Sequence, residues 1–353
     1  MESYINIDKN MIVNTTIGDA EVVWIDVKEA PFALHGFYKP YESEFYRRLP
    51  PEIAEATSPG VNLLSRESTG GRVRFSTDSP YIAIRAKFRV VGRSSHLTLI
   101  SSSGFDLYID GEFGSRFVKE FRMPYDMKDA YEQIIHLEAP IKRSYTLNFP
   151  VCSEVEELYV GVDEGCEIKC ATEYSLSRPI VFYGSSTTQG ACASRPGNTY
   201  ESIISRALDC DYINLGFWGN AMGEDAMAEY IASLDMSAFV YDYDYNAPTP
   251  EHLDATHERM FKIIREKNPE LPIVILSMPK YYLDENDRKR LEIIKRTYEN
   301  ALSEKDKHVA FISGKTMLEG VKDIALADNI HPGDVGFSEM AKHVLPKLKD
   351  MIF

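Results

Sequence analysis

The sequence of 353 residues predicts two domains of different class, a β-sandwich or jelly roll over residues 1–172 and a three-layer α/β/α domain over residues 173–353. Two patterns support this division. Up to about residue 172, short runs that alternate apolar and polar residues are separated by turn-forming residues, as in antiparallel sheets. After residue 179, apolar runs alternate with helical patterns, which is typical of a parallel sheet covered on both faces.

The N-terminal half is predicted to be rich in short strands. Residues 22–26 form the first candidate, and the rest of residues 1–60 carries weaker signals. Turn-forming segments such as STGG and SSSG separate the runs that follow, and many short strands at this spacing favour a sandwich or jelly roll. The further strands that we expect are 61–65, 72–77, 81–88, 96–100, 105–110, 133–138, 145–149 and 157–162.

The C-terminal half is predicted to contain a five-stranded parallel sheet, because five short apolar runs follow residue 179. The expected strands are 180–183, 212–216, 238–242, 272–277 and 308–313. The expected helices are 199–208, 224–234, 251–267, 285–304 and 334–350. In open sheets of this kind, ligands bind at the edge where the parallel strands end.

Composition and charge exclude several function classes. A net charge of −15, from 39 basic and 54 acidic residues, argues against a general nucleic-acid binder, because phosphate binding needs an excess of Lys and Arg. The first residues lack the basic and apolar segments of a signal peptide, and no run of about 18 apolar residues is present. We therefore expect a cytoplasmic protein without a membrane span.

Cysteine and glycine spacing predicts no disulfide framework, metal or cofactor. The five cysteines are odd in number and irregularly spaced, so we expect free thiols. Cys166 and Cys170 are four residues apart, but no second pair or histidine cluster completes a metal set. Gly216, Gly219 and Gly223 do not have the spacing of a dinucleotide-binding loop.

Four other side chains are given structural roles. His35 precedes a glycine but no G-x-S-x-G turn accompanies it, and Cys192 is interpreted as a small buried residue. His252 and His257 lack the H-E-x-x-H frame of a zinc site, so we expect both on a helix face in solvent.

The segment from Pro179 to Gly190, PIVFYGSSTTQG, carries the candidate nucleophile. Its apolar run predicts a buried strand, and Ser186 follows in the turn, at the sheet edge where ligands bind. A serine hydroxyl needs a base, and His331, in the loop before the last helix, is the candidate. Asp328, three residues earlier, can orient the imidazole and stabilise its cation.

Two residues after other strands complete a candidate site for acyl transfer. Such chemistry needs donors for a developing oxyanion. The backbone N–H groups of Ser186 and Gly219 and the side-chain amide of Asn246 can supply them. A glycine suits its position because no side chain obstructs the substrate.

The order of these residues resembles the SGNH (GDSL-type) hydrolases over residues 179–353. The blocks that carry the likeness are Gly184-Ser185-Ser186, Gly219, Asn246 and Asp328-x-x-His331. The usual G-D-S-L is replaced here by GSST. GFDLY (104–108) and YRRLP (46–50) are similar to the N-terminal domain joined to certain bacterial members.

The resemblance implies the roles of the site residues. It assigns Ser186 as nucleophile, His331 as base and Asp328 as its partner, with Ser186, Gly219 and Asn246 as the oxyanion hole. The candidate pocket residues are Thr187, Arg195 and Trp218, with Tyr200 also considered. Trp218 either narrows the acyl pocket, which would favour acetyl groups, or packs beneath its loop.

These inferences predict a serine esterase that needs no metal or cofactor and removes short acyl groups, most simply O-acetyl groups from carbohydrate. The expected partner is a small-molecule or oligosaccharide ester, and homo-oligomer formation is left open. Two alternatives are kept: an acylhydrolase acting on lipid or thioester chains, and a catalytically silent glycan-binding protein.

Overall fold

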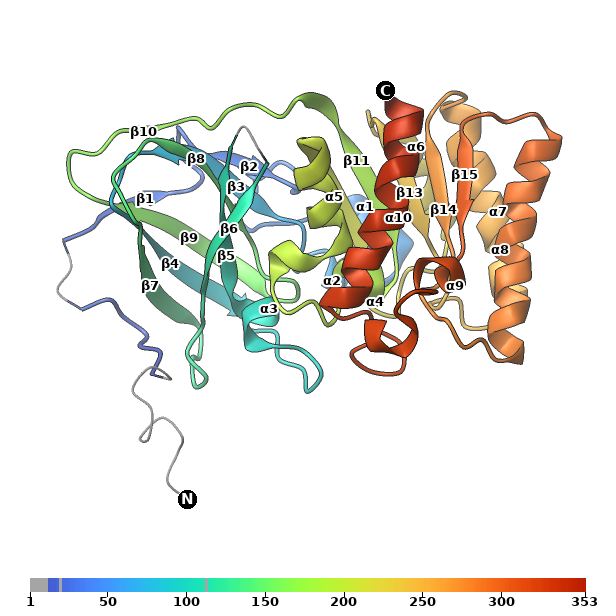
Figure 1. Ribbon diagram of the computed structural model, residues 1–353, viewed down its shortest axis with the longest axis horizontal. Helices are drawn as coiled ribbons and strands as arrows, with labels where there is room; N and C mark the ends of the chain where they lie inside the picture. Colours follow the sequence, from blue (N-terminus) through green and yellow to red (C-terminus); the bar gives the residue numbers. More distant parts are fainter. Residues whose placement is uncertain (1–11, 19–20, 112–113) are drawn as a thin grey trace, which may run out of the picture.

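A computed structural model of the protein describes residues 12–18, 21–111 and 114–353. Figure 1 shows antiparallel sheets from the N-terminal half on one side and helices around a parallel sheet on the other. The two antiparallel sheets have the strand orders β1-β9-β4-β7 and β10-β3-β8-β5-β6, with β2 paired to β3. Their strands are β1 (Val23–Asp26), β2 (Ala33–His35), β3 (Arg72–Thr77), β4 (Tyr81–Val90), β5 (Phe105–Asp110), β6 (Arg116–Phe121), β7 (Ala130–His136), β8 (Arg143–Asn148), β9 (Glu154–Val162) and β10 (Ile168–Lys169).

The antiparallel sheets share one hydrophobic core, as expected for a sandwich. Ile84 on β4 and Val160 on β9 come from one sheet, and Phe75 on β3 and Leu147 on β8 come from the other. All four side chains are fully buried in a single cluster. Because successive strand residues point to opposite faces, the alternation in these segments directs one set of apolar side chains inward.

Two predicted strands of this region are wrong. Residues 61–65 lie in or next to α2 (Pro59–Leu64), and residues 96–100 overlap α3 (Leu99–Ser103). A further short helix, α1 (Pro51–Thr57), comes just before α2. Ser58 caps α2 through its hydroxyl, and Thr98 does the same for α3. A capping side chain satisfies an N–H that the first helical turn leaves free, so these short apolar runs become helices.

The five-stranded parallel sheet is present, in the order β12-β11-β13-β14-β15. All neighbouring strands in it are parallel. The strands are β11 (Leu176–Gly184), β12 (Cys210–Gly216), β13 (Ala238–Asp242), β14 (Ile273–Leu276) and β15 (Val309–Ile312). The helices are α4 (Ser186–Gln189), η3 (Pro196–Asn198), α5 (Tyr200–Leu208), α6 (Asp225–Ser233), α7 (Pro250–Lys267), α8 (Glu285–Ser303), α9 (Gly314–Met317), η4 (Lys322–Ala325) and α10 (Asp334–Ile352).

Helices cover both faces of this sheet, which confirms the predicted three layers. One hydrophobic cluster joins the sheet to α6, α7 and α8, with Ile231, Phe261 and Ile294 as members. A second cluster joins the opposite face to α5 and α10, with Ile204 and Val344 as members. The strands are therefore buried on both sides, which explains why they are continuous apolar runs in the sequence.

Two side chains expected near solvent or substrate are buried instead. His257 has no exposed surface, and its Nδ1 lies 2.8 Å from Thr297 Oγ1. Burial lowers the pKa of His257 to about 3, so this histidine is neutral. Tyr200 is also fully buried and stacks on Phe337, which corrects the suggestion that it faces the substrate.

The N-terminal half also packs against the parallel sheet. Leu49, Ala54 and Val61 are fully buried in the same hydrophobic cluster as α6 and α7. Division of the chain at residue 172 stays a prediction. Among the residues that the structure describes, we find no helix whose length and apolar content would let it span a bilayer.

Candidate active site

Ser186 stands at the first position of α4, directly after β11. The hydroxyl of Ser185 accepts the N–H of Thr187 at 3.2 Å and caps this short helix. A Cβ at Gly184 would lie 2.3 Å from the carbonyl oxygen of Asp242 on the neighbouring strand, so only glycine fits at this position. The turn leaves Ser186 partly exposed, whereas the candidate pocket residue Thr187 is buried.

The structure brings Ser186, His331 and Asp328 together. Ser186 Oγ lies 2.9 Å from His331 Nε2, and His331 Nδ1 lies 2.7 Å from Asp328 Oδ2. The three groups thus form a continuous hydrogen-bonded series of hydroxyl, imidazole and carboxylate. Such a series can activate a serine hydroxyl for attack on an ester carbonyl.

The Asp328 carboxylate is held in place by its own loop. Its Oδ1 accepts the backbone N–H groups of Ile330 and His331, both at 2.7 Å. Burial alone would raise the pKa of Asp328, but hydrogen bonds from the His331 ring and from these N–H groups outweigh it and hold the pKa at about 2. Asp328 is therefore ionised at neutral pH and fixes the orientation of the ring.

The turn after β12 carries one candidate oxyanion donor, the N–H of Gly219, and contacts a second, Asn246. Gly219 has a φ of +59°, and no atom lies within 4 Å of where its Cβ would stand. Asn246 donates through Nδ2 to the carbonyl of Phe217 at 2.7 Å, which links the loop after β13 to this turn. The N–H of Trp218 donates to Gln189 Oε1 at 3.0 Å, which links the turn to α4.

Trp218 and Arg195 have different surroundings. The Trp218 ring lies 6.1 Å from the His331 ring between centroids, so this side chain borders the site. The Arg195 guanidinium instead donates to Asp106 Oδ2 at 2.9 Å and to the hydroxyl of Tyr108. Arg195 therefore contacts the N-terminal half of the chain rather than the His331 ring.

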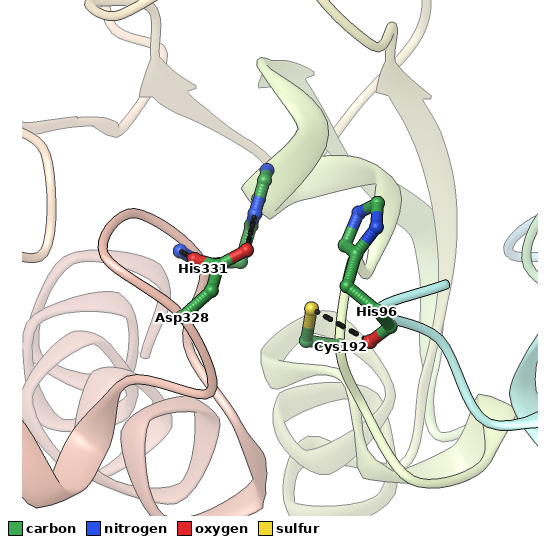
Figure 2. A group of neighbouring side chains, drawn as sticks. All are labelled: His96, Cys192, Asp328 and His331. Atoms are coloured by element: carbon green, nitrogen blue, oxygen red, sulfur yellow. Dashed lines mark hydrogen bonds and ion pairs between the residues drawn. The ribbon is translucent and has the colours of Figure 1, made fainter. Parts of the chain in front are cut away.

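His96 and Cys192 also lie at the site, and sequence reasoning did not place them there. The His96 ring stacks on the His331 ring with 5.4 Å between centroids. Cys192 Sγ donates to the carbonyl of His96 at 3.3 Å, as Figure 2 shows. His96 belongs to the segment before α3, so the N-terminal half contributes to the wall of the site. No spacing in the sequence signals this contact, because it depends on how the two halves pack.

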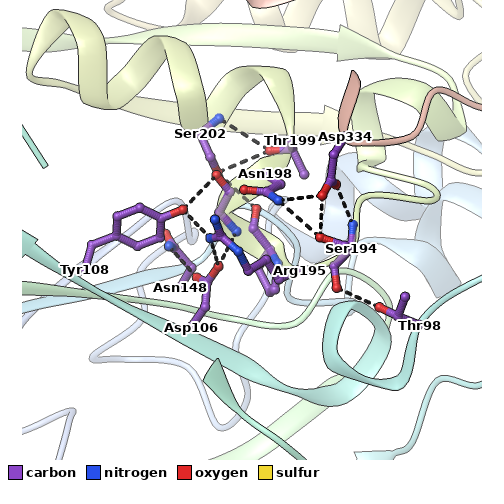
Figure 3. A network of polar contacts seen from close by, with 12 residues as sticks. Thr98, Asp106, Tyr108, Asn148, Ser194, Arg195, Asn198, Thr199, Ser202 and Asp334 are labelled. Carbon is purple, nitrogen blue, oxygen red and sulfur yellow. Dashed lines mark hydrogen bonds and ion pairs between the residues drawn. The ribbon is translucent and has the colours of Figure 1, made fainter. Parts of the chain in front are cut away.

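The GFDLY segment is anchored against the loop after α4, as Figure 3 shows. Asp106 has no exposed surface and accepts from Asn148 Nδ2 at 2.7 Å and from the N–H of Gly197 at 2.8 Å, besides Arg195. Tyr108 donates to the carbonyl of Gly197 at 3.3 Å. The charged side chain of this motif is therefore an internal partner of the 195–197 segment.

The same loop is tied to the start of α10, close to His331. Ser194 donates its N–H and its hydroxyl to Asp334 at 2.8 and 2.6 Å, and Asn198 Nδ2 donates to the same carboxylate at 2.8 Å. Thr98 donates to the carbonyl of Ser194 at 2.7 Å. Contacts from the N-terminal half thus reach, through one loop, the helix that follows His331.

Comparison with known proteins is consistent with this geometry. Residues 177–349 match the model of the GDSL-like lipase/acylhydrolase family. Residues 22–168 match the GxDLY model, which describes the N-terminus of SGNH hydrolase-type esterases. No curated protein sequence matches the chain.

Several solved structures have the same fold. A Bacteroides ovatus protein assigned to the GDSL-like lipases superposes with a TM-score of 0.85 at 26% identity, covering 94% of this chain and 98% of that one. The salicylyl-acyltransferase SsfX3 of a tetracycline pathway has a TM-score of 0.75 at 19% identity, covering 94% and 97%. The acetyl xylan esterase Est2A of Butyrivibrio proteoclasticus has a TM-score of 0.61 at 13% identity, covering 94% and 98%. Because the two family models together span most of the chain, the protein belongs to the GDSL-type SGNH hydrolases that carry a GxDLY domain, and it is a carboxylic ester hydrolase.

Proposed function

We propose that this protein hydrolyses short-chain acyl esters through an acyl-enzyme formed on Ser186. The observation that carries the proposal is the hydrogen-bonded series in which Ser186 Oγ lies 2.9 Å from His331 Nε2 and His331 Nδ1 lies 2.7 Å from Asp328 Oδ2. Each distance is within the range needed for proton transfer or for fixing a tautomer.

The first half of the reaction acylates Ser186. His331 Nε2 takes the hydroxyl proton as Ser186 Oγ bonds to the carbonyl carbon of the ester. Negative charge gathers on the carbonyl oxygen, where the N–H groups of Ser186 and Gly219 and the amide of Asn246 donate to it. The intermediate then breaks its bond to the alcohol oxygen, which leaves with the proton from His331.

The second half of the reaction hydrolyses the acyl-enzyme and regenerates free Ser186. A water molecule gives a proton to His331 and bonds to the acyl carbon. The bond from that carbon to Ser186 Oγ then breaks, and the serine regains its proton from His331. The carboxylic acid is released, and Asp328 stabilises the imidazolium in both halves without itself becoming protonated.

We propose O-acetyl groups on carbohydrate as the substrate class. Trp218 stands beside the His331 ring, where a bulky indole restricts the length of the acyl group. An acetyl xylan esterase is among the proteins that share this fold over 94% of the chain, which supports the carbohydrate part of the proposal. The proposal extends the family assignment to a particular ester.

A chain-length series of p-nitrophenyl esters, followed by acetate release from acetylated oligosaccharides, tests this function. We expect the highest rate with acetyl and loss of activity in Ser186→Ala. Ser303→Ala, an exposed serine on α8, serves as the matched control and should keep full activity. Mass spectrometry of the quenched enzyme should place the acyl group on the peptide that contains Ser186.

The alternatives predict different results. A rate that increases toward long chains would favour lipid or thioester substrates and refute the acetyl proposal. Absence of hydrolysis with every ester, together with glycan binding, would indicate a catalytically silent binding protein.

A further inference from the structure

Four side chains of types that can bind a metal ion, among them the proposed catalytic base, lie close together. His96, Cys192, Asp328 and His331 each offer one ligand atom, and these four atoms all lie within 4.8 Å of one another. Figure 2 shows the four side chains converging from both halves of the chain. Two imidazoles, a thiol and a carboxylate are the ligand types that bind Zn²⁺ in proteins.

The His96 ring is held with one nitrogen available. Its Nδ1 lies 2.8 Å from the hydroxyl of Ser94, and His96 is exposed. A hydrogen bond at one ring nitrogen fixes the tautomer in metal sites and leaves the other nitrogen to bind the ion. Ser94 is therefore placed as an outer partner of a metal ligand.

Cys192 is held toward the same point by an unusual backbone conformation. Its φ of +67° lies in the left-handed region, which a residue with a side chain seldom adopts. Such conformations gather at functional sites because the surrounding structure must enforce them. The thiol makes a hydrogen bond to the backbone carbonyl of His96, which fixes the position of Cys192 relative to the segment that carries the His96 ring.

We infer that these four residues form an inhibitory site for a borderline-soft divalent cation of the Zn²⁺ type. Tetrahedral Zn²⁺ places its ligand atoms about 3.5 Å apart, so atoms spread over 4.8 Å need to approach one another by roughly 1 Å. The exposed His96 can turn to do this. Binding releases the thiol proton of Cys192 to solvent, and the two negative ligands then balance the charge of the ion.

The inhibitory part of the inference rests on the proposed function. Both ring nitrogens of His331 are used in that reaction, Nε2 with Ser186 and Nδ1 with Asp328. A metal ion bound through either nitrogen therefore removes the base. Mg²⁺ and Ca²⁺ prefer oxygen ligands, and a site with a single carboxylate should not bind them.

Co²⁺ provides a test that does not depend on activity, because a thiolate bound to Co²⁺ gives a charge-transfer absorption band. We expect the full-length protein to show this band, Zn²⁺ to displace it, and p-nitrophenyl acetate hydrolysis to fall as Zn²⁺ binds. EDTA should restore hydrolysis, and Mg²⁺ should have no effect.

Cys192→Ser should abolish the band and raise the half-inhibitory Zn²⁺ concentration at least about tenfold, with inhibition measured relative to the variant's own rate without Zn²⁺. Cys170→Ser, at an exposed cysteine, is the matched control and should behave as the unmodified protein. Ser94→Ala, on an exposed segment, should weaken Co²⁺ binding about tenfold and serves if Cys192→Ser fails to fold.

Three results would contradict the inference. Absence of the band in the unmodified protein, or its persistence in Cys192→Ser, would overturn the site. Inhibition abolished by Cys170→Ser would place the ion elsewhere. A band without inhibition would overturn the inhibitory role, while leaving a metal site at Cys192 in place.

Discussion

Replacement of Asp106 by asparagine removes the charge from a carboxylate that has no exposed surface. Asp106 pairs with Arg195 at 2.9 Å and accepts further hydrogen bonds from Asn148 and the N–H of Gly197. The amide of asparagine would turn a donor toward groups that are themselves donors. Breaking a buried ion pair from one side costs about 3–5 kcal/mol, so we expect the free energy of unfolding to fall by that amount.

Equilibrium urea unfolding measures this effect, and Asp225→Asn is the matched control. Asp225 makes an ion pair with Arg259 in which both side chains are about half exposed, so its loss should change stability little. The two tryptophans, Trp24 on β1 and Trp218 beside the active site, report on both halves of the chain by fluorescence. Coincidence of fluorescence and far-UV circular dichroism transitions would justify a single unfolding free energy.

Two results would refute this reasoning. The first is an Asp106→Asn protein whose unfolding free energy stays within about 1 kcal/mol of the unmodified protein, since that is the range of exposed pairs. The second is an equal loss in Asp225→Asn, which would show that burial is not the cause. Either would mean that the GFDLY motif contributes something other than an internal ion pair.

Three further predictions concern the site and its surroundings. Asn246→Ala should lower kcat about 10²–10³-fold in steady-state kinetics if its amide donates to the oxyanion. The control Asn300→Ala, on α8, should leave kcat unchanged. A loss below about threefold in Asn246→Ala would remove Asn246 from that role. His331→Ala should lower kcat more than Asp328→Asn, because removing the base abolishes proton transfer while the asparagine can still accept the backbone N–H of residue 331; equal losses would contradict this order. Burial raises the pKa of Asp242 to about 8, so the folded protein keeps a proton that the unfolded chain loses; the free energy of unfolding should therefore decrease as pH rises from about 4 to 8. Calorimetry should show a flatter dependence in Asp242→Asn, and an unchanged slope would exclude this carboxyl group as a cause.

The sequence predicts the parallel sheet well because its strands are buried on both faces. Segments such as 180–183 and 238–241 are therefore apolar throughout. The segments 61–65 and 96–100 are equally short and mostly apolar, but they lie in or overlap helices. Periodicity does not distinguish a strand from a helix at this length. The Ser58 hydroxyl, which caps α2, favours the helix at residues 61–65.

The candidate site likewise contains residues that the sequence predicts and residues that it does not. Ser186, Asp328 and His331 can be predicted because each lies at the edge where parallel strands end. His96 and Cys192 cannot, since their contact with His331 depends on how two parts of the chain pack against each other. Tertiary packing of this kind leaves no periodic signal in either segment.

The two short motifs that distinguish the N-terminal half act on the hydrolase loops. Arg48, within YRRLP, is buried and donates to the carbonyls of Asn214 and Gly216 at 2.9 and 2.8 Å, at the end of β12. Its guanidinium also lies 4.7 Å from the centre of the Phe217 ring. A guanidinium presents five N–H donors in a rigid plane, so it can hold several carbonyls in fixed positions at once.

Arg48 thus braces the strand that leads into the candidate oxyanion turn, and Asp106 braces the loop that binds Asp334 at the start of α10. These are the two segments whose positions decide whether the donors at Gly219 and the ring of His331 meet one substrate. The turn at Gly219 and the 195–197 segment themselves lie past the ends of the parallel strands. The N-terminal half therefore has a physical reason to accompany this hydrolase whether or not it binds a glycan: it supplies the buried charged groups that fix the two loops.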